Sequence, residues 1–133
     1  MNPVVRGILA VIAGMLVAFV LIVVVQTIGT RIYPPPPMDR TNIDSIKAAM
    51  AQIPLASLLF VLLSYAAGSV AGGWVAARFA PRDKMAHAMT LAALLFCLGI
   101  MNLISLPHPP WFWVASSAIY WLGAWSGAKA AGA

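Results

Sequence analysis

Long apolar runs occupy most of the sequence, and they limit its possible folds more than any other feature. A helix needs roughly 20 consecutive apolar residues to cross a hydrocarbon core about 30 Å thick. Four runs approach or exceed this length, at about residues 4–29, 54–79, 85–106 and 111–129. The chain has 62% hydrophobic and only 8% charged residues. A soluble protein of 133 residues has too small an interior to bury that many hydrophobic side chains. The sequence therefore predicts an all-α integral membrane four-helix bundle, as one transmembrane domain.

A polar stretch separates the first two runs and predicts a surface element. It covers residues 30–52 and includes four consecutive prolines, residues 34–37, which lack N–H donors and cannot continue a helix. Behind them, apolar residues recur at helical intervals. Thr41 and Asp44 have the spacing of a capping box. We expect a short interfacial helix over about residues 42–52, lying on the membrane surface.

A repeated motif marks the second and fourth runs. The pattern Y-x-x-G-x-x-x-G is formed by Tyr65, Gly68 and Gly72, and again by Tyr120, Gly123 and Gly127. Glycines four residues apart leave a groove on one helix face, where another backbone can approach closely in lipid. The four glycines are therefore predicted helix-packing residues. The recurrence also raises an alternative description of the bundle, as two helical hairpins related by a parallel repeat.

Few polar residues lie inside the runs. Four of them are candidates for a polar interior: Ser64, Tyr65, Asn102 and Tyr120. Side chains of these types can hydrogen-bond across neighbouring helices in a membrane. Gln26 lies where the first helix is expected to leave the hydrocarbon, so we interpret it as an interface residue. The sequence assigns no role to His87 or His108.

The basic residues indicate an orientation. Five of them flank the runs on the side that holds both termini: Arg6, Arg78, Arg82, Lys84 and Lys129. The other three, Arg31, Arg40 and Lys47, fall in the polar stretch on the opposite side. Cytoplasmic loops carry the excess of Lys and Arg, so both termini are predicted to be cytoplasmic. Because these residues are scattered at span ends and form no stripe, nucleic acid is not an expected partner.

Three stretches resemble a known type of membrane protein. They are R-I-Y-P-P-P at residues 31–36, an Ala- and Gly-rich stretch at residues 59–73, and M-N-L-I-S-L-P-H-P-P-W-F-W at residues 101–113. Together they are similar to an uncharacterised family of small bacterial four-span inner-membrane proteins of unknown function. The resemblance implies a multi-pass protein of the bacterial inner membrane and supplies no activity.

Two classes of function remain after the motifs are weighed. The sequence contains no catalytic constellation, cofactor motif or metal-ligand spacing, so neither an enzyme nor a cofactor-binding protein is expected. The favoured class is a structural or accessory subunit, because that role requires no catalytic or coupling residues. Such a subunit would bind lipid and either another membrane protein or a second copy of this chain. The alternative is a small facilitative transporter or channel for a small or hydrophobic solute. Proton-coupled exchange is disfavoured, because all three acidic residues lie outside the runs.

Overall fold

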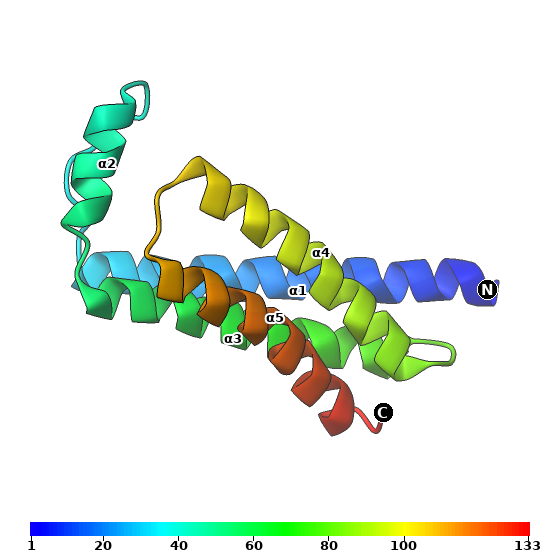
Figure 1. Cartoon of the computed structure of the whole chain (residues 1–133). Coiled ribbons are helices and arrows are strands. Elements are labelled where there is room, and N and C mark those ends of the chain that lie inside the picture. The colour runs from blue at the N-terminus through cyan, green and yellow to red at the C-terminus, as the bar shows by residue number, and fades with distance from the viewer.

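The computed structural model describes all 133 residues, and it is all-α (Figure 1). Five helices contain 80% of the residues, and there are no strands. They are α1 (Pro3–Ile32), α2 (Ile43–Ala51), α3 (Leu55–Phe79), α4 (Lys84–Ser105) and α5 (Pro110–Ala130). Prolines mark several boundaries, since Pro54 precedes α3 and Pro110 lies in the first turn of α5.

Three helices, α1, α3 and α4, are long and apolar enough to cross a membrane. The outer face of α1 is apolar as well. Large apolar side chains such as Ile8, Leu16, Val20 and Val23 are exposed along it. Contiguous apolar surface of this extent is rare on soluble proteins and is consistent with a membrane protein.

The central helix is α3, which packs against α1, α4 and α5. Glycines bring α1 and α3 together. A β-carbon added at Gly72 would lie 2.8 Å from the carbonyl oxygen of Gly14, and one at Gly68 would lie 2.9 Å from that of Ala18. Both distances are too short for a real contact, so glycine is what allows the two backbones to touch.

The second motif makes the same kind of approach between α5 and α3. A β-carbon at Gly123 would overlap the hydroxyl of Ser69, and one at Gly127 would overlap the carbonyl oxygen of Val70. The two glycine pairs therefore lie against neighbouring helices of the same chain: the pair on α3 faces α1, and the pair on α5 faces α3.

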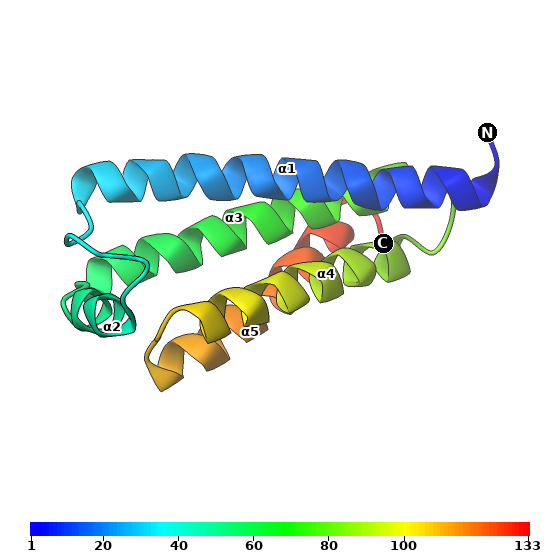
Figure 2. The same cartoon turned by 90° about the horizontal axis from the view of Figure 1, so that it is seen from above.

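The four long helices alternate in direction, so both termini lie at the end of the molecule away from α2 (Figures 1 and 2). At this end, two basic side chains form hydrogen bonds between segments that are distant in the sequence. Arg6 Nε donates to the carbonyl oxygen of Phe79 at 3.1 Å, and Lys84 Nζ donates to that of Ala131 at 3.1 Å. They join the beginning of α1 to the end of α3, and the beginning of α4 to the C-terminal segment.

The short helix α2 contacts no other helix and projects sideways from the long ones (Figure 1). Its start differs from the sequence prediction. Asn42 is the N-cap, because its side-chain oxygen accepts from the backbone N–H groups of Asp44 at 3.0 Å and Ser45 at 3.4 Å. The Thr41 hydroxyl instead donates to the Asp39 carboxylate at 2.7 Å. The predicted capping box was therefore wrong, since Asn42 lies one residue closer to the helix and takes the cap.

Candidate functional site

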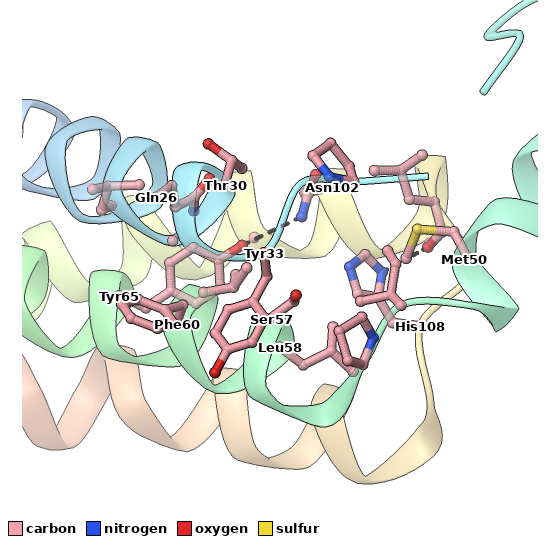
Figure 3. Close-up of a pocket in the computed structure, with 18 of the residues that line it drawn as sticks. Gln26, Thr30, Tyr33, Met50, Ser57, Leu58, Phe60, Tyr65, Asn102 and His108 are labelled. Atoms are coloured by element: carbon pink, nitrogen blue, oxygen red, sulfur yellow. Dashed lines mark hydrogen bonds between the residues drawn. The ribbon is translucent and has the colours of Figure 1, made fainter. Parts of the chain in front are cut away.

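A cavity of about 370 Å³ lies between α1, α3 and α4, at the end of the molecule that carries α2 (Figure 3). Phe19 and Ile22 of α1, Leu58 of α3 and Leu95 of α4 are among the apolar residues of its walls. The proline segment that follows α1 also lines it, together with Met50 of α2. The surface element predicted from the polar stretch therefore contributes to the wall of a cavity.

Three of the four predicted interior residues meet at this cavity. Asn102 Nδ2 donates to the hydroxyl of Tyr65 at 3.3 Å, and the ring centroids of Tyr65 and Tyr120 are 5.1 Å apart. Gly99 makes room for the second ring, because a β-carbon there would lie 2.6 Å from Cε2 of Tyr120. The tyrosines of the two repeated motifs thus come together beside one amide.

The fourth predicted residue, Ser64, is fully buried next to the cavity and bonds to Gln26, the residue that the sequence places at the membrane interface. Gln26 Nε2 donates to Ser64 Oγ at 3.1 Å, and Ser64 Oγ in turn donates to the Val61 carbonyl. Gln26 also lines the cavity. A signal was present in the sequence, because Gln26 continues the four-residue spacing of Ala18 and Ile22, which face α3.

A histidine to which the sequence assigned no role also lines the cavity. The ring of His108 stacks on that of Phe112, with centroids 4.8 Å apart and an interplanar angle of 18°. His108 Nδ1 donates to the carbonyl oxygen of Leu106 at 2.7 Å, because a carbonyl can only accept. Burial lowers the pKa of His108, so the neutral ring is favoured.

The lining contains no Lys, Arg, Asp or Glu among its 25 residues. A charged ligand in this cavity would be desolvated without an opposite charge to pair with, which is costly. Its polar groups are amides, hydroxyls and an imidazole, which suit an uncharged ligand that forms hydrogen bonds. No group of three or more His, Cys, Asp or Glu side chains that could hold a metal ion comes together in the protein.

These observations define an all-α protein with helices able to cross a membrane and an uncharged cavity at one end. Comparisons of the chain with protein-family models, curated proteins and solved structures found no match.

Proposed function

We propose that this protein crosses the membrane four times and binds a neutral amphiphilic ligand in the cavity. The fourth span in this proposal is α5. It has 21 residues, which at 1.5 Å per residue is about 31 Å, and it packs against α3 and α4. Exposed Trp111 and Trp113 lie in its first turn and Lys129 in its last, as expected for the two interfaces.

The proposed orientation follows from charge. The end of the molecule that holds the termini carries five of the eight basic residues, so it is assigned to the cytoplasm. The cavity and α2 then belong to the outer leaflet of the bacterial inner membrane that the family resemblance implies. A reporter fused to the C-terminus and active only on the outer side would contradict this assignment.

The observation that carries the ligand proposal is an uncharged cavity whose lining includes exposed apolar residues of α1 and α4. α1 and α4 touch near Gly14 and Leu91, and in both views they diverge toward the end where α2 lies (Figures 1 and 2). Phe19 of α1 and Leu98 of α4 both line the cavity, and both are exposed. An amphiphile from the bilayer can enter between these helices, with its apolar part against aromatic and aliphatic side chains and its polar group near Asn102.

Photolabelling tests this proposal directly. Three diazirine probes with the same alkyl chain would be compared in proteoliposomes, one ending in an alcohol, one in an ammonium and one in a carboxylate. The alcohol is expected to label cavity residues such as Phe19 and Leu98 more strongly than the two charged probes. Asn102→Leu should reduce that labelling, whereas Ser126→Ala, on the exposed face of α5, should not.

The labelling pattern has a clear negative outcome. If the alcohol probe marks lipid-facing residues such as Leu122 as strongly as the cavity residues, the probe is sampling bulk lipid. Equal labelling by all three probes would likewise contradict selection for a neutral ligand.

The two functions favoured by the sequence have separate tests. Facilitative transport requires a continuous path, but the cavity reaches only to Tyr65 and Tyr120, and the Gly14 and Gly72 backbones touch nearer the cytoplasmic end. We therefore expect no vesicle flux of small neutral solutes, and flux abolished by Asn102→Leu would favour transport instead. The accessory role stays a prediction, and identification of proteins that co-purify in mild detergent tests it.

A further inference from the structure

A second hollow, of about 510 Å³, lies at the opposite end of the molecule from the cavity. It is a groove formed by the first turns of α1, the beginning of α4 and the turn between α3 and α4. Because it shares no lining residue with the cavity, its occupant is independent of the ligand proposed above.

One wall of the groove is apolar and exposed. It includes Val4, Ile8 and Ile12 of α1 and Leu94 of α4. The three α1 residues lie on one helix face, and residues 4 to 12 span about 12 Å along its axis. A wall of this length can support several methylene groups of an acyl chain that lies parallel to the helices.

The other end of the groove is polar. Arg82 and Asp83, adjacent and both exposed, line it together with the half-buried His87. The tip of the imidazole points at α1, and glycine at position 7 makes room for it: a β-carbon at Gly7 would be 2.6 Å from His87 Nε2. His87 Nδ1 donates to the carbonyl oxygen of Asp83 at 3.1 Å, one turn earlier on the chain.

Arg82 differs from the other basic side chains at this end of the molecule. Arg6 and Lys84 each donate to a backbone carbonyl at 3.1 Å, and Arg78 and Lys129 each lie 5.9 Å from the centroid of an aromatic ring. These four cations already have partners within the protein. Arg82 is the cation that the groove presents to a ligand.

We propose that this groove binds a phosphatidylethanolamine molecule of the inner leaflet. The phosphodiester pairs with the Arg82 guanidinium, which can donate two parallel hydrogen bonds to it. The primary ammonium of the headgroup lies beside the Asp83 carboxylate, and one acyl chain lies along the apolar wall. The adjacent opposite charges of the groove complement a zwitterion, whereas an anionic headgroup would place no cation against Asp83.

Native mass spectrometry of the protein with added lipid tests the assignment. Phosphatidylethanolamine and phosphatidylglycerol with identical acyl chains are compared, and the first is expected to bind more tightly. Arg82→Gln should weaken binding of both by about tenfold through loss of the charge-assisted hydrogen bonds. Arg40→Gln, which lies outside the groove, is the matched control and should change neither.

Asp83→Asn tests the contact with the ammonium. Asp83 has a φ of 48°, in the left-handed region that asparagine also tolerates, so the variant should keep the backbone of the turn. It should lower the affinity for phosphatidylethanolamine to that for phosphatidylglycerol. Unchanged lipid preference in this variant, or unchanged binding in Arg82→Gln, would overturn the proposal. So would equally tight binding of glycerophosphoethanolamine, which lacks acyl chains.

Discussion

Gly72 offers the sharpest test of how the helices are held together. The substitution Gly72→Ala adds one methyl group to the face of α3 that meets α1. That methyl would lie 2.8 Å from the carbonyl oxygen of Gly14 and 3.1 Å from the β-carbon of Ala18. The nearest atom belongs to helical backbone and cannot rotate away, so α1 must shift or separate from α3.

Two opposing contributions determine the size of the effect. Alanine is better than glycine in a helix interior by about 1 kcal/mol, which favours the variant. Overpacking a close contact costs about 1–3 kcal/mol. Because the clash is with backbone, the cost lies near the top of that range, and we expect a net loss of about 2 kcal/mol in the free energy of unfolding.

Equilibrium unfolding in mixed micelles of dodecyl maltoside and sodium dodecyl sulfate measures this loss, with tryptophan fluorescence as the signal. Gly7→Ala is a matched control, because its added methyl meets the tip of the His87 ring, which can rotate. That control should be neutral or slightly stabilising. If Gly72→Ala is as stable as the parent protein, the close approach of α1 and α3 at Gly72 is refuted.

Three further predictions concern other parts of the chain. Burial lowers the pKa of His108 below 6.5, so the folded state binds its proton less readily than the unfolded chain. The contribution of neutral His108 to the free energy of unfolding should therefore be complete above about pH 6.5 and be lost as the pH drops toward the folded pKa. Unfolding measured at several pH values should show this loss in the parent protein but not in His108→Asn. Asn42→Ala removes the cap of α2 and should destabilise that helix by about 1 kcal/mol. Amide exchange across α2 should become faster while global unfolding stays unchanged, because α2 contacts no other helix. Gly99→Ala should displace the Tyr120 ring and reduce photolabelling of the cavity by the alcohol probe; unchanged labelling would show that this ring does not shape the site.

The positions of the helices were largely predictable because their signals are local. Run length and prolines locate each helix, and the observed bounds fall close to the predicted ranges. Local signals are ambiguous where neighbouring residues compete for one role. Thr41 and Asn42 both have capping side chains, and the backbone at the helix start decides that Asn42 is the cap.

The candidate site was only partly predictable. Tyr65, Asn102 and Tyr120 stand out as polar groups within apolar runs, which indicates an interior position without saying what surrounds them. His108 received no role, and Gln26 was named only as an interface residue, because its partner Ser64 is 38 positions away in the sequence. The residue type and its neighbours along the chain do not reveal such a partner.

The sequence by itself determined that this chain is helical and has segments long and apolar enough to cross a membrane, because run length and hydrophobicity act residue by residue along the chain. It also marked the Y-x-x-G-x-x-x-G pairs as places of close approach. Only the tertiary structure decided that Gly72 meets Gly14 and that Tyr65 meets Tyr120. The same packing leaves one uncharged cavity and one groove with paired charges at opposite ends. The physical reason is that a cavity forms where helices diverge, and their crossing depends on contacts between residues far apart in the chain.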